Sequence, residues 1–194
     1  MQFSFLKVAV AALAVCNNAV LGALTPQQIV SNIQMLTSKS QALQAPAQSI
    51  TILNGPLIII GQGPFPQIIA GFTDIITTVT VAIAQMQGTP VITVEADATA
   101  IANTFREFVR VHQVLLNILI GKSGLFSTVP IIGQPVAAIL RQLESVVDTI
   151  AFGLIDTIDG GAGTAKGDVT KDANSLSATI GTAIEKYEGI QLTV

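Results

Sequence analysis

Hydrophobic residues recur at helical spacing along most of the chain. The first such segment opens at Thr25-Pro26-Gln27-Gln28, where a threonine N-cap, a proline at the first helical position and a glutamine three residues after the cap form a capping box. Apolar residues then fall mostly on one face, at Ile29, Ile33, Leu36 and Leu43. The pattern predicts a helix from Thr25 to about Gln44, which Pro46 stops or kinks.

Two longer segments follow with clear helical periodicity. From Pro66 onward one apolar stripe consists of Ile68, Phe72, Ile75, Ile76, Val79, Ile83 and Met86. After a turn at 88–90, a helix opens at Thr93 and runs to Gly121 with the stripe Ile101, Phe105, Phe108, His112, Leu115 and Leu119. At about 1.5 Å per residue this second segment is about 40 Å long, the length of a full bundle helix.

The remaining pattern completes a helical protein. Pro135 starts a helix whose apolar stripe consists of Val136, Ile139, Leu143, Val146, Ile150, Leu154 and Ile158. A glycine-rich linker follows at 160–163. The last helix is more polar, and its stripe consists of Val169, Ala173, Leu176, Ile180, Ile184 and Tyr187. The stretch 50–63 has no clear period, and residues 57–60 suit a short strand, a buried extended segment or a helical turn equally. The sequence predicts an all-α fold, an antiparallel helical bundle of four to five helices.

The N-terminal residues predict a secretory signal peptide. Lys7 ends a short n-region, an apolar run follows from Val8 to Val15, and small and polar residues lead to Gly22 and Ala23. The run is too short to cross a membrane, so we expect no transmembrane segment there. We expect a signal peptide over residues 1–22, a single helical domain over 23–194, and a secreted, extracellular protein.

Composition then limits the partners. Half of the residues are hydrophobic and only 11% are charged, and Asp74 is the one charged residue between Ser40 and Val94. After loss of Lys7, eight basic and twelve acidic side chains remain without a basic cluster, which disfavours nucleic acid as a partner. So apolar a chain either buries much surface around a cavity or a partner, or presents apolar surface.

The sequence contains few residues that could form a catalytic or a metal-binding site. His112 is the only histidine, no Gly-x-Ser-x-Gly elbow accompanies it, and the only cysteine, Cys16, lies in the expected signal peptide. We therefore expect no enzyme, no catalytic residues, no cofactor and no metal site. His112 is expected to be a half-buried polar residue on a core stripe, and the functional alternative is that it meets a ligand headgroup inside the bundle.

The segment from Phe105 to Ile158 closely resembles the fungal hydrophobic surface-binding protein A family, which is related to cell-wall galactomannoproteins. The resemblance covers essentially the mature chain and implies that residues 23–194 form a single helical hydrophobic surface-binding-like domain. The resemblance rests on the signal peptide, the Thr-Pro-x-x start, the long helix leading into Leu116-x-x-Leu119 and Lys122, then Leu125-Phe126, Pro130, Leu140-x-x-Leu143 and Val147-Asp148. It implies a secreted, non-enzymatic helical bundle that adsorbs to hydrophobic surfaces and recruits secreted esterases or cutinases. Some related mannoprotein domains bind fatty acids in a tunnel between helices.

Unlike cell-wall members, the sequence has no Ser/Thr-rich stalk, no Asn-x-Ser/Thr sequon and no hydrophobic tail of a GPI signal. We therefore expect free secretion, and the alternative is association with the cell wall without a GPI anchor. The leading hypothesis is a protein that binds hydrophobic surfaces through apolar helix faces. The alternative is a carrier of fatty acids or similar lipids between its helices. For either, the candidate binding residues are Ile68, Phe72, Ile76, Val79, Ile83, Phe105, Phe108 and His112.

Overall fold

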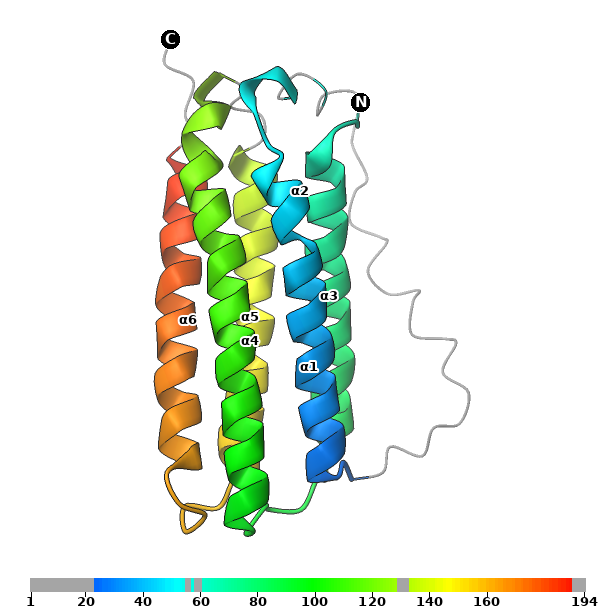
Figure 1. Ribbon diagram of the computed structural model, residues 1–194, viewed down its shortest axis with the longest axis vertical. Helices are drawn as coiled ribbons and strands as arrows, with labels where there is room; N and C mark the ends of the chain where they lie inside the picture. Colours follow the sequence, from blue (N-terminus) through cyan, green and yellow to red (C-terminus); the bar gives the residue numbers. More distant parts are fainter. Residues whose placement is uncertain (1–22, 55–56, 58–60, 129–132, 190–194) are drawn as a thin grey trace, which may run out of the picture.

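The computed structural model describes residues 23–54, 57, 61–128 and 133–189. Five long helices stand side by side in this part of the chain (Figure 1): α1 (Pro26–Ala42), α3 (Pro64–Met86), α4 (Glu95–Lys122), α5 (Gly133–Thr157) and α6 (Ala165–Glu188). Shorter turns connect them: α2 (Gln44–Gln48) and the 3-10 turns η1 (Ile52–Asn54) and η3 (Ser123–Thr128). The predicted all-α bundle is confirmed. The expected signal peptide, and residues 58–60 of the ambiguous stretch, lie outside the described residues.

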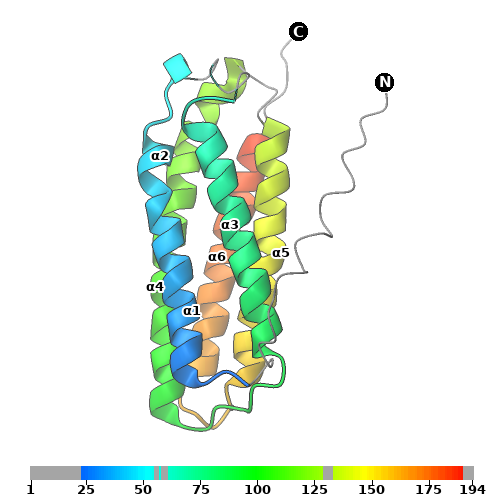
Figure 2. The same cartoon turned by 90° about the vertical axis from the view of Figure 1, so that its right-hand side faces the viewer.

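The long helices are arranged as a ring. Consecutive long helices run in opposite directions (Figure 1), and the packed pairs are α1 with α4, α4 with α6, α6 with α5, and α5 with α3. Between α1 and α3 the ring closes with much less contact than between these pairs. The reason is visible in Figure 2, where α3 crosses the bundle obliquely, near α2 at one end and near α5 at the other. We call the α1–α3 contact the seam.

The start of α1 agrees with the predicted capping box. The Gln28 backbone N–H donates to Thr25 Oγ1 at 3.2 Å, and the Thr25 N–H donates to Gln28 Oε1 at 2.8 Å. The break comes slightly before the predicted end at Gln44, because α1 stops at Ala42 and α2 begins at Gln44. Pro46 lies inside α2, and a proline ring conflicts with the carbonyl four residues earlier, which here belongs to Ala42.

The start of α4 is two residues later than expected. Instead of opening at Thr93, the helix begins at Glu95 after the N-cap residue Val94. The preceding segment is extended because Ile92 forms an isolated parallel bridge with Ile158, in which the Ile92 N–H donates to the Thr157 carbonyl at 2.8 Å. This bridge ties the end of α5 to the start of α4.

The inner faces of all five long helices meet in one continuous core. Its largest buried side chains include Phe72, Phe105, Phe108 and Tyr187. Tyr187 is fully enclosed and donates its hydroxyl to the Leu119 carbonyl at 2.9 Å, which satisfies the buried oxygen and pins α6 to α4.

The threonines of α3 bond within their own helix, as the threonines of the other long helices also do. Four threonines on this helix, Thr73, Thr77, Thr78 and Thr80, donate their hydroxyls to the backbone carbonyl four residues earlier, at 2.8 to 2.9 Å. The hydroxyls are therefore satisfied within α3 itself, and no neighbouring helix is needed for them.

Among the described residues, α3 is also the helix that is long and apolar enough to cross a membrane, with a mean hydropathy of 1.6 over its best window. A core helix of a bundle passes the same test, and Phe72, Ile75 and Val79 of α3 are fully enclosed by the other helices. The expected absence of a transmembrane segment stays a prediction.

Two helical glycines give a test of the packing of α2 against α3. A Cβ on Gly71 would lie 2.3 Å from Cδ2 of the buried Leu43, whereas a Cβ on Gly181 in α6 would meet no atom within 4 Å. We expect Gly181→Ala to raise the free energy of unfolding by up to about 1 kcal/mol through helix propensity. Gly71→Ala should lower it by about 1 to 3 kcal/mol through overpacking. Chemical denaturation of both variants checks this, and equal shifts would show that Leu43 moves aside freely.

Candidate functional site

The core contains an imidazole, that of His112, on the inner stripe of α4. Its exposed fraction is 0%, and its ring lies between aromatic rings from two helices. The ring of Phe72 from α3 meets it edge-on with centroids 6.2 Å apart, and the ring of Phe108 lies tilted at 5.3 Å. On the α1 side, Nδ1 is 2.8 Å from the hydroxyl oxygen of Ser40, which is also fully buried. His112 therefore joins α1, α3 and α4.

Only one of the two ring nitrogens is satisfied. Nδ1 shares a hydrogen bond with Ser40, whereas the buried Nε2 has no hydrogen-bond partner among the described residues. Burial lowers the pKa of His112 to about 4, because the charged imidazolium would lose its hydration in the core. The ring is neutral near pH 7, and an unpaired polar nitrogen faces an apolar interior. Such groups are rare in native cores because leaving them unpaired is costly.

The seam lies on the α1–α3 side of this histidine. Among the described residues two polar side-chain contacts span it: the ion pair of Lys39 with Asp74, and a hydrogen bond of 3.4 Å from Asn32 Nδ2 to Gln85 Oε1. Lys39 is the neighbour of Ser40 in sequence, so the ion pair closes the seam beside His112. The seam also contains a groove of about 240 Å³ lined by Asn32, Met35, Thr77, Thr78, Val81, Ala82 and Gln85.

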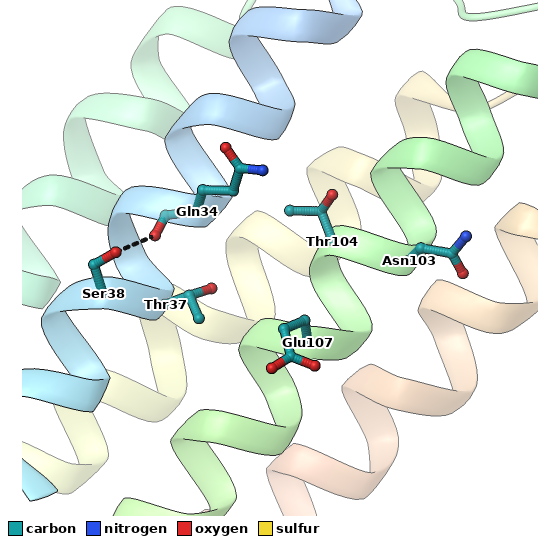
Figure 3. Close-up of a pocket in the computed structure, with 6 residues that line it drawn as sticks. All are labelled: Gln34, Thr37, Ser38, Asn103, Thr104 and Glu107. Carbon is teal, nitrogen blue, oxygen red and sulfur yellow. Dashed lines mark hydrogen bonds between the residues drawn. The ribbon is translucent and has the colours of Figure 1, made fainter.

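Two other grooves lie between other pairs of helices. Figure 3 shows the one between α1 and α4, about 380 Å³ in volume, which is lined by Gln34, Thr37, Ser38, Asn103, Thr104 and Glu107. A groove of about 360 Å³ between α3 and α5 is lined in part by Ile83, Met86 and Phe152, and the Phe152 side chain is 66% exposed. Grooves thus lie on both sides of α3.

The helical architecture of this chain matches that of several solved structures. AfMP4p in complex with palmitic acid matches with a TM-score of 0.72 at 18% identity, over 84% of this chain and 99% of that chain. Ligand binding domain 1 of Penicillium marneffei MP1, complexed with arachidonic acids, matches with a TM-score of 0.67 at 14% identity, over 83% and 95% of the two chains. The fold is shared with these fatty-acid complexes. No protein-family model matches the chain, and no curated protein sequence matches it, so the resemblance to the hydrophobic surface-binding protein A family stays a prediction.

Domain 2 of the same MP1 protein, complexed with multiple arachidonic acids, also matches with a TM-score of 0.67 at 15% identity, over 84% of this chain and 94% of that chain. Identities this low establish the common fold and leave open which residues act in this chain.

The structure brings part of the predicted set of binding residues together. The rings of Phe72 and Phe108 each contact the imidazole of His112, and Phe105 contacts Phe108 with centroids 6.0 Å apart. The remaining four predicted residues lie on α3: Ile68 and Val79 are buried in the core, and Ile76 and Ile83 are half-buried against it. Six of the eight are therefore enclosed in the core, where an enclosed ligand could meet them, whereas Ile76 and Ile83 lie at its edge. For the folded protein to adsorb to a surface through the six enclosed residues, the bundle would have to open.

Sequence reasoning missed Ser40 and the contacts that close the seam. Ser40 lies four residues after Leu36 and seven after Ile33, so it occupies a core position of α1. A polar residue on each of two inner stripes, Ser40 on α1 and His112 on α4, was the available signal. The pairing of Asp74 with Lys39 had no sequence signal, because the relative placement of α1 and α3 decides it.

The Ser40–His112 pair resembles two members of a hydrolytic triad, but its surroundings do not favour catalysis. A general base needs a third group that orients it, and here Nε2 has no partner among the described residues. A pKa lowered to about 4 also makes this imidazole a weak base, and both side chains are fully buried away from solvent.

The buried histidine should leave a signature in the pH dependence of stability. The unfolded chain binds a proton at His112 with a pKa near 6.5, and the folded chain binds it with a pKa of about 4. Its contribution to the free energy of unfolding is therefore complete above about pH 6.5. It falls as the pH drops toward 4, by a total of about 3 kcal/mol. Urea denaturation of the wild type and of His112→Leu at several pH values measures this, and the variant should lack the step. Parallel profiles would contradict a neutral buried ring.

Proposed function

We propose that this protein is a non-enzymatic carrier that encloses the acyl chain of a fatty acid or similar lipid beneath the α1–α3 seam. The observation that carries the proposal is that the weakest contact of the ring, which is held by few polar contacts, lies beside His112, whose buried Nε2 has no hydrogen-bond partner among the described residues. The solved complexes of the same fold with palmitic and arachidonic acids support this function over a surface-binding one.

The interior suits an acyl chain energetically. Each buried methylene group contributes about 0.8 kcal/mol, so a chain of sixteen carbons gains on the order of 10 kcal/mol before the costs of association and of opening the bundle. Beneath the seam the walls are aliphatic and aromatic, with Leu36 from α1, Val79 from α3 and Phe105 from α4. This gain does not depend on a specific motif, which explains how a carrier can lack one.

Opening the seam disrupts few favourable polar contacts. The side chains of Lys39 and Asp74 are 28% and 57% exposed, and ion pairs of such exposure contribute about 0 to 1 kcal/mol. The Asn32–Gln85 bond is long at 3.4 Å and partly exposed to water. The larger cost comes from apolar contacts, which a lipid chain replaces with its own.

Adsorption to a hydrophobic surface is a second proposal, and one observation favours it. At the end of the bundle next to α2, the side chains of Ile52 and Leu53 in η1 are 63% and 89% exposed, and that of Leu57 is 37% exposed. Such a cluster of exposed aliphatic side chains can contact an oil or wax surface without unfolding the bundle. Secretion, association with the wall and recruitment of esterases or cutinases stay predictions.

The first test is direct detection of the lipid. We expect native mass spectrometry of the protein incubated with palmitic acid to show a bound complex, with circular dichroism confirming that helicity is retained. Retention on octyl beads by wild type and by a Leu53→Ser variant separates the second proposal, since only adsorption through the exposed tip should weaken in that variant. Failure to bind any long-chain lipid would contradict the carrier function.

The second test concerns the seam as the route for the lipid. A short bismaleimide bridging cysteines at Asn32→Cys and Gln85→Cys should slow exchange of bound palmitic acid at least tenfold, because α1 and α3 can no longer separate. A matched cross-link at Gln113→Cys and Thr179→Cys, whose side chains are hydrogen-bonded at 3.0 Å between α4 and α6, should leave exchange unchanged. Equal exchange rates in both cross-linked proteins would place the route elsewhere.

A further inference from the structure

We infer that His112 is the receptor for the carboxyl group of a fatty acid, which binds head first with a carboxyl oxygen hydrogen-bonded to Nε2 at the centre of the bundle. This inference rests on the proposed carrier function and deepens it, because it assigns the polar end of the ligand and its direction.

The unpaired nitrogen is the first argument. Nε2 is completely buried and lacks a partner among the described residues, although the same ring satisfies Nδ1 through Ser40. A buried polar atom without a partner destabilises the protein by itself, and a ligand atom that pairs with it removes that cost. The unpaired nitrogen therefore points to a polar group supplied by the ligand.

The chemistry of the pair selects a carboxyl group. If the Ser40 hydroxyl donates to Nδ1, then Nε2 bears the proton and donates to a carboxyl oxygen. If Nδ1 donates to Ser40, then Nε2 accepts from the hydroxyl of a protonated carboxyl group. A carboxyl group satisfies both tautomers, as the hydroxyl of a fatty alcohol also does, whereas the carbonyl of an ester satisfies only the first.

The walls of the site argue against larger headgroups. Phe72 and Phe108 lie 6.2 and 5.3 Å from the imidazole centroid, so bulky charged heads such as phosphocholine would have to be buried against aromatic rings. The seam lies on the Ser40 side of this point, and we place the acyl chain along it, where the groove between α1 and α3 is lined by Met35, Val81 and Ala82 together with polar side chains. The head thus lies deep, and the tail extends along the seam.

The single histidine makes the test specific. In protein labelled with ¹⁵N-histidine, one imidazole gives both ring signals, so no assignment is needed. Palmitic acid should shift the Nε2 resonance, whereas hexadecane, delivered from the same cyclodextrin, should bind with little effect on it. We expect His112→Leu to reduce the preference for palmitic acid over hexadecane by about tenfold or more, the effect of losing one hydrogen bond to a charged or strongly polar group. Hexadecane binding should persist in this variant.

A second variant controls for a loss of binding that is caused by misfolding. His112→Gln retains a side-chain amide near the position of Nε2 and should recover part of the preference for the acid. Unchanged preference in His112→Leu, together with an unmoved Nε2 resonance, would overturn the inference while the carrier function stands. If the wild type binds neither palmitic acid nor hexadecane, the carrier function fails, and the inference fails with it.

Discussion

Burial of apolar helix faces in one shared interior is the interaction on which the whole structure depends. The chain has a single cysteine, so no intramolecular disulfide supports the fold, and the described helices meet no sheet. Each long helix therefore has to turn its stripe inward, and five of them close into a ring. Whatever lies on an inner stripe becomes buried, polar residues included. This constraint places His112 among Phe72 and Phe108 and lowers its pKa.

The same constraint explains how much of the fold could be predicted. Helical periodicity gave the five long helices, and the capping box gave the start of α1 correctly, because both are local properties. The start of α4 was wrong by two residues, since Ile92 bonds to the end of α5, more than sixty residues away in sequence. Pairings of this kind depend on tertiary contacts that no local pattern contains.

The candidate site, too, could be predicted only as far as local sequence patterns reach. The sequence predicted that Phe72, Phe108 and His112 belong to inner stripes, and the structure adds that they meet. It did not predict the seam, because α1 and α3 are both ordinary amphipathic helices, and only the oblique path of α3 makes their contact weak. The ionic partner of Asp74 likewise could not be predicted, because only the packing of α3 against α1 brings Lys39 to it.

The threonines of α3 give this helix a mechanical property. Their hydroxyls bond within their own helix, so they form no tether to a neighbour. A rigid displacement of α3 leaves all four of these bonds intact. Dispersion contacts with the neighbouring helices are numerous, individually weak and tolerant of small sliding steps. Movement of this one helix can therefore change the volume of the interior without breaking these four hydrogen bonds.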